Sequence, residues 1–168
     1  IEDQELHPVA ILLTHGHFDH VMAVDSVRTA YHIPVYAAEA EKETMQDASI
    51  NLSINMGGAM LSVEADHWLK DGETITLLDQ EVRCILTPGH TVGGMCFYFP
   101  KAGMLFSGDT LFQESVGRTD FPGGSMSEIV RSIREKLFVL PDAVQVYPGH
   151  GLMTSIKNEK MFNPFAVE

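Results

Sequence analysis

Four short apolar segments of this chain each end in a tight turn that is followed at once by a histidine or an aspartate. Each segment reads as a buried strand, and the four stretches are ILLTHGH (11–17), CILTPGH (84–90), MLFSGD (104–109) and VQVYPGH (144–150). The glycines that let the backbone turn sharply at these points are Gly16, Gly89, Gly108 and Gly149. Strands of a sheet bring their ends to a common edge, where function is commonly built. The pattern therefore predicts that His90, Asp109 and His150 lie close to the first of these turns.

The first turn carries an unusual density of metal-ligand side chains. The stretch THGHFDH (14–20) places His15, His17, Asp19 and His20 within six residues. Folding gains nothing from crowding three imidazoles and a carboxylate in one turn, whereas both groups are ligands of first-row divalent metals. The sequence thus predicts a metal site that the later histidines and Asp109 complete.

Composition limits the classes of partner. The chain has 168 residues, 45% of them hydrophobic, which suits one globular domain. A formal net charge of −12 disfavours nucleic acid as a partner, because phosphate backbones are repelled. Apolar runs are too short to span a membrane, so no membrane association is expected. Cys84 and Cys96 do not make a disulfide framework, which favours a reducing, cytoplasmic location.

Periodicity and capping signals indicate the elements between the turns. Helices are expected over 19–31, 39–47, 125–137 and 155–162, the third opened by a capping box of Ser125 and Glu128. Residues 48–59 and 111–124 read as long irregular segments, and the expected strands are 8–13, 33–37, 74–78, 82–86, 95–99, 104–106 and 143–147. Because the sequence starts at Ile1 and not at Met, we expect the native N-terminus to lie upstream.

These motifs together resemble the metallo-β-lactamase superfamily. The HxHxDH spacing is followed by a histidine, an aspartate and a histidine at strand ends. The stretches GDTLF (108–112) and GRTDF (117–121) are similar to the glyoxalase II branch, which includes hydroxyacylglutathione hydrolases and persulfide dioxygenases. The ending NPF (163–165) resembles the short, single-domain bacterial hydrolases of that branch. The resemblance covers essentially the whole chain.

The resemblance implies an α/β fold, the αββα sandwich, as one domain over residues 1–168. Members of the family begin with a β-hairpin and a helix that this chain lacks, so the sandwich is expected to be N-terminally incomplete.

The resemblance also implies two divalent metal ions, with zinc preferred and iron or manganese as alternatives. His15, His17 and His90 would hold one ion, Asp19, His20 and His150 the other, and Asp109 would bridge them. Asp19 and Asp109 are the expected catalytic residues, and Arg118 is the candidate for gripping a carboxylate of the substrate. Such a site would activate a metal-bridging hydroxide near neutral pH.

Three functions fit this pattern. The first is hydrolysis of a small-molecule thioester such as S-lactoylglutathione, and the second is a persulfide dioxygenase with one Fe(II). The third is a metal-binding fragment without activity. β-Lactam hydrolysis is disfavoured, because true β-lactamases of the superfamily typically lack a ligand at His20 and carry a cysteine in place of Asp109. The oligomeric state is left open.

Overall fold

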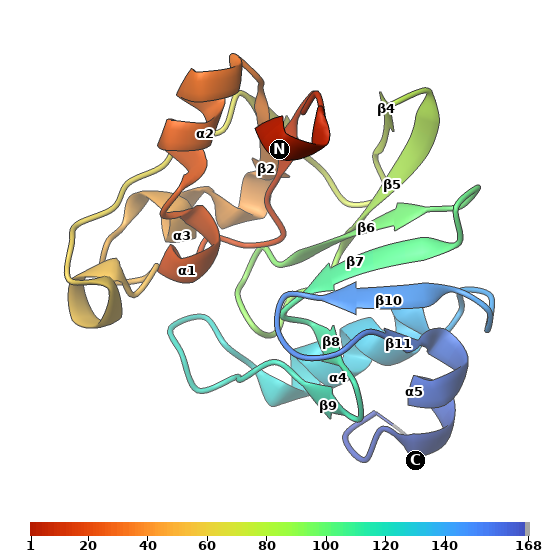
Figure 1. Ribbon diagram of the computed structural model, residues 1–168. Coiled ribbons are helices and arrows are strands. Elements are labelled where there is room, and N and C mark those ends of the chain that lie inside the picture. Colours follow the sequence, from red (N-terminus) through yellow and green to blue (C-terminus); the bar gives the residue numbers. More distant parts are fainter. Residues whose placement is uncertain (167–168) are drawn as a thin grey trace.

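The computed structural model describes residues 1–166, which form four layers in the order helices, sheet, sheet, helices (Figure 1). The first sheet is parallel and has the order β1 (Ile11–Leu12), β2 (Val35–Ala38) and β3 (His67–Leu69). The helices α1 (Phe18–Val21), α2 (Val24–Tyr31) and α3 (Lys42–Gln46) lie on its outer side. A single-turn helix, η2 (Glu39–Glu41), leads into α3.

The second sheet has six strands, and most of its neighbours are antiparallel. Its order is β11–β10–β7–β6–β5–β4, with only β10 and β7 parallel. The strands are β4 (Thr74–Leu77), β5 (Gln80–Leu86), β6 (Met95–Phe99), β7 (Met104–Gly108), β10 (Gln145–Pro148) and β11 (Thr154–Ser155). Its outer face carries α4 (Met126–Ser132), the π-helical turn η4 (Ile133–Leu137) and α5 (Ile156–Phe162).

Three apolar cores hold the layers together. One lies between α4, η4 and α5 and the outer face of the second sheet, and includes Leu105, Ile129 and Ile156. A second joins the first sheet to its helices. The third fills the space between the sheets, where Leu69 of β3 packs with Phe97 of β6. This layering confirms the α/β sandwich expected from the sequence.

Part of the inner face of the second sheet is open to solvent. Phe106 shares this face with Phe97 and stacks on Tyr147, with ring centroids 5.4 Å apart. Its side chain is nevertheless 39% exposed. Within the described residues β1 is an edge strand of the first sheet.

Several boundaries differ from the sequence expectations. The single helix expected over 19–31 is two helices, because the chain turns at Met22 and Ala23 while keeping buried Val21 and Val24 at helical spacing. The segment 48–59, expected to be a loop, contains the π-helical turn η3 (Ser53–Gly57). The irregular segment 111–124 contains a small hairpin of β8 (Leu111–Phe112) and β9 (Ser115–Val116).

Other expectations are confirmed. Ser125 caps α4 and its hydroxyl accepts from the Glu128 amide, and the hairpin of β4 and β5 is antiparallel. Both cysteines are free and buried, and burial raises the pKa of each thiol to about 11, so they are inert near neutral pH. No helix among residues 1–166 is long and apolar enough to cross a membrane.

Gly89 shows how tightly the turn before His90 is built. Its φ is +138°, and a Cβ there would lie 2.3 Å from the amide nitrogen of Ile129 in α4. Neither backbone can yield without moving His90 or the helix. Gly108 also has a positive φ of 50°, whereas Gly16 and Gly149 do not have positive φ. A Cβ at Gly149 would instead lie 2.3 Å from Oδ1 of Asp109.

We predict that Gly89→Ala lowers the free energy of unfolding by about 1–3 kcal/mol, the usual cost of overpacking, and also weakens metal binding. Gly103→Ala is the matched control, because Gly103 has a φ of +62° but open space around it. Urea unfolding compares the two variants. Equal losses would show that backbone strain, and not the contact with Ile129, sets the cost.

Candidate metal centre

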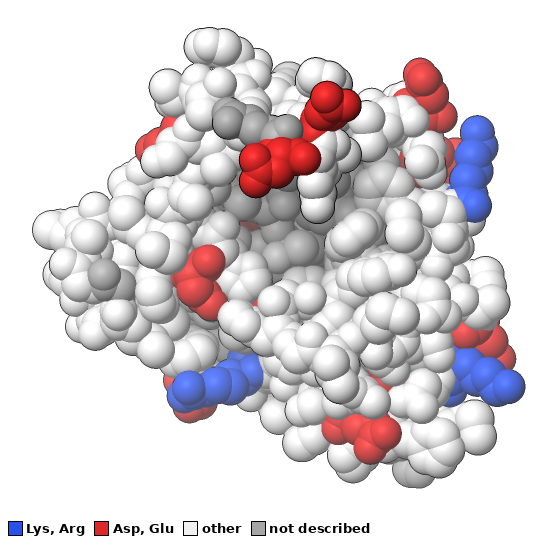
Figure 2. Space-filling model, viewed as in Figure 1, with Lys and Arg blue, Asp and Glu red and all other residues white. Residues whose placement is uncertain are grey.

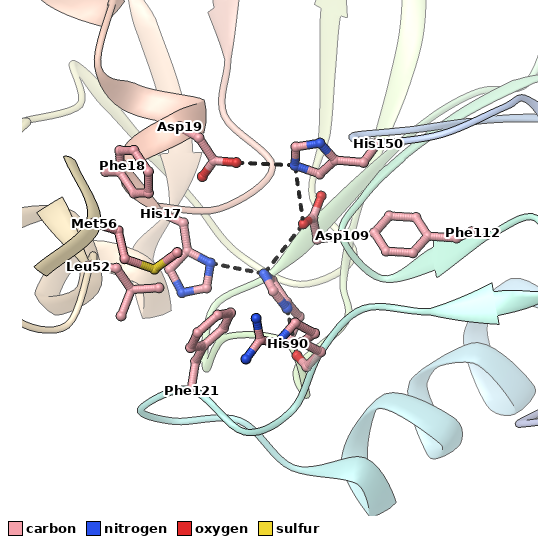
Figure 3. Close-up of a pocket in the computed structure, with 11 residues that line it drawn as sticks. His17, Phe18, Asp19, Leu52, Met56, His90, Asp109, Phe112, Phe121 and His150 are labelled. Atoms are coloured by element: carbon pink, nitrogen blue, oxygen red, sulfur yellow. Dashed lines mark hydrogen bonds and ion pairs between the residues drawn. The ribbon is translucent and has the colours of Figure 1, made fainter.

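Four turns at one edge of the sandwich, together with α1, carry the seven candidate ligands. His15 and His17 follow β1, and Asp19 and His20 lie on α1. His90, Asp109 and His150 follow β5, β7 and β10. Figure 3 shows the side chains of His17, His90, Asp109, His150 and Asp19 pointing toward one another. The structure therefore brings together residues that are up to 135 positions apart in the sequence, from His15 to His150.

The ligand atoms are close enough to share ions. His17 Nδ1 lies 2.9 Å from His90 Nε2, and His150 Nε2 lies 3.1 Å from Asp19 Oδ2. Asp109 is at the centre, with Oδ1 at 3.4 Å from His20 Nε2 and Oδ2 at 3.6 Å from His90 Nε2. Three groups have ligand atoms within 4.8 Å of one another: His15, His17 and His90; His15, His20 and Asp109; and Asp19, His20 and His150.

Buried polar atoms in this cluster lack hydrogen-bond partners. They are His15 Nε2, His17 Nε2 and Asp109 Oδ1. His20 Nε2 lies 3.4 Å from Asp109 Oδ1, which is within ion-pair distance, but the two atoms do not form a hydrogen bond. Leaving such atoms unpaired costs roughly 1–3 kcal/mol each. His15 Nε2 and Asp109 Oδ1 are the atom types that bind first-row divalent cations, so the residues present fit a metal.

Burial keeps the histidines in the form that binds metals. Burial of the ring, reinforced by neighbouring histidines, lowers the pKa of His15 well below its ordinary value of 6.5. Burial lowers the pKa of His17 to about 4, with His90 as the next cause. Burial also raises the pKa of Asp109, although His20 and His90 oppose this shift. A cation at the cluster would reverse that effect by favouring the ionised carboxylate.

One hydrogen bond orients His90. Its Nδ1 lies 2.7 Å from the backbone carbonyl of Arg118, and a carbonyl can only accept. His90 therefore carries its proton on Nδ1, and the lone pair of Nε2 faces His17 and Asp109. Such outer partners fix the orientation of metal-binding histidines.

The cluster opens into a cleft of about 330 Å³, within the range of small-molecule sites. Besides candidate ligands and Arg118, its walls are apolar; they are formed by Phe18, Leu52, Met56, Phe112 and Phe121 (Figure 3). The cleft can therefore receive a ligand with an apolar portion against the candidate metal cluster.

Hydrogen bonds of Asn51 connect the wall of the cleft at Leu52 to the start of α1, which carries candidate ligands. Its side chain donates to the carbonyl of Leu61 at 2.9 Å and accepts from the amide of Ser53, while its own carbonyl accepts from the amide of Phe18. The side chains of both Asn51 and Ser53 are buried. These bonds hold Leu52, which has a φ of +68°, at the base of η3 facing the cleft.

The family follows from the sequence comparison. Residues 1–150 match the Metallo-beta-lactamase superfamily. The chain belongs to this superfamily. The four-layer fold and the ligands at strand ends are consistent with that membership.

Two curated proteins are similar to this chain over almost its whole length. A protein of Bacillus subtilis (strain 168) named probable metallo-hydrolase YqgX is 40% identical over 166 residues, which are 98% of this chain and 79% of the relative. Hydroxyacylglutathione hydrolase GloC of Haemophilus influenzae is 33% identical over 169 residues, with the same coverage of 98% and 79%.

Two solved superfamily structures are also similar. The BLEG-1 B3 metallo-beta-lactamase has a TM-score of 0.93 at 40% identity, covering 99% of this chain and 81% of that one. TTHA1623, solved in a di-iron-bound form, has a TM-score of 0.85 at 36% identity, covering 98% and 80%. One similar structure thus holds two irons, and this chain has a metallo-β-lactamase fold with a candidate metal site.

Sequence reasoning found the polar centre of the site but not its walls. All seven candidate ligands converge, and Arg118 lines the cleft. The roles of Leu52, Met56 and Phe121 were not foreseen, because isolated apolar residues in loops carry no periodic signal. Glu41, a buried carboxylate near the cluster, was also missed, since it stands among several other glutamates in the sequence.

The lowered pKa of His17 makes the stability of the metal-free protein depend on pH. The unfolded chain takes up a proton at this residue as pH falls below about 6.5, whereas the folded chain does so only near pH 4. Stability is therefore full above 6.5 and falls between 6.5 and 4, by up to about 1.4 kcal/mol per pH unit for each such group.

Urea unfolding of the metal-free protein across this range tests the prediction, and His17→Gln should flatten the dependence. His7→Gln is the control, because His7 is exposed and outside the cluster. A pH profile that is the same in wild type and His17→Gln would show that His17 does not titrate as described.

Proposed function

We propose that this protein is a metal-dependent thioesterase that hydrolyses a small thioester such as S-lactoylglutathione. Its proposed ligand sets are His15, His17 and His90 for one divalent cation and Asp19, His20 and His150 for the other, with Asp109 between them. When bound, two such cations would supply Lewis acidity and a hydroxide nucleophile near neutral pH. Zinc suits the imidazole-rich set, and iron or manganese suits it as well.

The chain's own residues would orient the reactants. Asp19 Oδ2 faces His150, and the side chain of Asp19 is partly exposed to the cleft, so its carboxylate can accept a hydrogen bond from the attacking water. The apolar walls would exclude bulk water from the scissile bond and receive the apolar part of the substrate.

The residues that line the cleft favour a thioester as the substrate. Among the described residues that line it, the only titratable side chain outside the candidate metal cluster is Arg118. An amine leaving group needs a proton from a general acid, and this lining offers no free one. A thiolate can leave without it, because a thiol has a pKa of about 8.5. The site therefore suits a thioester better than an amide.

Arg118 is the proposed anchor for a carboxylate of the thiol carrier. Its Nε and Nη2 donate to the two oxygens of Asp120 at 2.9 and 2.8 Å, and its guanidinium lies over the ring of Phe121. These bonds leave Nη1 to donate to a ligand, although Asp120 partly neutralises the charge. On the face shown in Figure 2, lysines and arginines stand apart and do not form a basic patch.

The proposed function is tested by three assays on the metal-loaded protein. We expect cleavage of S-lactoylglutathione, with no oxygen uptake on glutathione persulfide and weak or no hydrolysis of a β-lactam. Oxygen uptake with one bound iron would instead favour the persulfide dioxygenase. Efficient β-lactam cleavage, the activity named for BLEG-1, would contradict the leaving-group argument. A folded, metal-loaded chain inactive in all three assays would support the non-catalytic alternative.

Replacing the central carboxylate should abolish hydrolysis. We predict that Asp109→Asn lowers kcat by at least about a hundredfold, because charge stabilisation of this kind is worth that much or more. The control is Asp25→Asn, an exposed carboxylate on α2 that is not part of the candidate metal cluster. Steady-state kinetics with matched metal loading measures the effect, and unchanged hydrolysis would refute the central role of Asp109.

The pair of Arg118 and Asp120 should control affinity for an anionic substrate. We predict that Arg118→Ala raises KM about tenfold with little change in kcat, as expected for loss of a charge-assisted bond of about 1.5–3 kcal/mol that acts equally in ground and transition states. Asp120→Asn should lower KM, because it removes the competing carboxylate. If both substitutions changed KM in the same direction, Arg118 would be acting only as a local structural partner.

A further inference from the structure

Glu41 is a buried carboxylate that bonds to two of the turns that carry the candidate ligands. It ends η2, and its residue exposure is 1%. Oε1 accepts from the amide of Gly16 at 2.9 Å. Oε2 accepts from the Thr91 hydroxyl at 3.0 Å and from the amide of Gly93 at 2.7 Å. Each oxygen thus holds a different turn.

The turns in question are those of the three-histidine group. Gly16 lies between His15 and His17, and Thr91 follows His90 directly. Gly93 also packs against the backbone of η2, since a Cβ on it would lie 2.3 Å from the amide nitrogen of Glu41. Glu41 therefore connects the segment before α1 with the segment between β5 and β6, which are 73 residues apart at His17 and His90.

Burying a carboxylate at this position costs free energy of desolvation. Burial raises the pKa of Glu41, and the bonds from Gly16, Thr91 and Gly93 act against that shift. An apolar residue would pack in the same space without the cost of desolvating a carboxyl group, but it could not hold two backbone amides and a hydroxyl at once. The carboxylate thus bonds both turns through its two oxygens.

We propose that Glu41 is a positioning residue that holds His15 and His17 in register with His90, and thereby sets the affinity of this group for its cation. The inference rests on the metal-binding part of the proposed function, not on the thioester substrate. The other group is held differently: His20 lies within α1 and His150 follows β10, whereas the described hydrogen bonds of the Glu41 side chain go to Gly16, Thr91 and Gly93. The effect should therefore be selective for one of the two cations.

The test is Glu41→Gln, which keeps the volume but turns an amide NH₂ toward one of the donors. Metal affinities are measured by competition with a chromophoric chelator, and Co²⁺ spectra identify the ion held by the three histidines. We expect affinity at that group to fall about 10- to 100-fold, as is typical when an outer partner is lost. Affinity at the group of Asp19, His20 and His150 should be unchanged.

Glu159→Gln is the matched control. Glu159 is also fully buried, with 0% exposure, and accepts from the amide of Glu114, the hydroxyl of Thr154 and the amide side chain of Asn163. These partners lie outside the candidate metal cluster. Glu159→Gln should lower the free energy of unfolding without changing either metal affinity. Thr91→Val gives a second, milder test, because it removes one of the three bonds and should weaken the same cation by a smaller factor.

Three results would overturn the positioning role. They are wild-type affinities in Glu41→Gln, an equal loss for both cations, and the same loss in Glu159→Gln. These results are independent of the thioester assay. The wild-type protein could bind both cations and cleave no thioester, while Glu41→Gln selectively weakens the binding of one cation. That outcome would contradict the proposed substrate and support the role of Glu41.

Discussion

The site depends on the meeting of four strand-end turns around the partly buried carboxylate of Asp109. Its oxygens lie between His20 and His90, and Oδ1 has no hydrogen bond. His15 and His17 of the same cluster have pKa values that burial lowers, which favours their neutral form. Such a cluster is unfavourable as a purely protein structure, since unpaired polar atoms and a buried acid both cost free energy. A divalent cation would satisfy these atoms, which is why metal binding is the physical explanation of the arrangement.

The rest of the fold makes this meeting possible. The cores on either side of the second sheet fix β5, β7 and β10, so the turns after them share one edge. The first sheet delivers the remaining ligands from β1 and α1, and Glu41 bonds the turn after β1 to the turn after β5. The chemistry is therefore carried by loops, whereas their precision comes from buried strands and a few buried polar groups.

The sequence revealed those features that depend on local chemistry. The N-cap at Ser125 and the strand over 95–99 were predicted correctly, because a helix cap and a short apolar run are local features of a few residues. The ligand set could be assembled because four apolar segments each end beside a glycine and at least one candidate ligand. The break between α1 and α2 at Met22 could not be predicted from the sequence, because the buried positions keep helical spacing across it. The three-residue β3 and the contacts of Glu41 depend on residues distant in sequence, and no local pattern encodes them.

The account is tested most directly by anomalous scattering from a crystal of the metal-loaded protein, with data collected on both sides of the absorption edge. We expect two peaks that flank Asp109, one among His15, His17 and His90 and the other among Asp19, His20 and His150. A single peak held by one of these groups would contradict the shared role of Asp109, and peaks away from this edge of the sandwich would contradict the site itself.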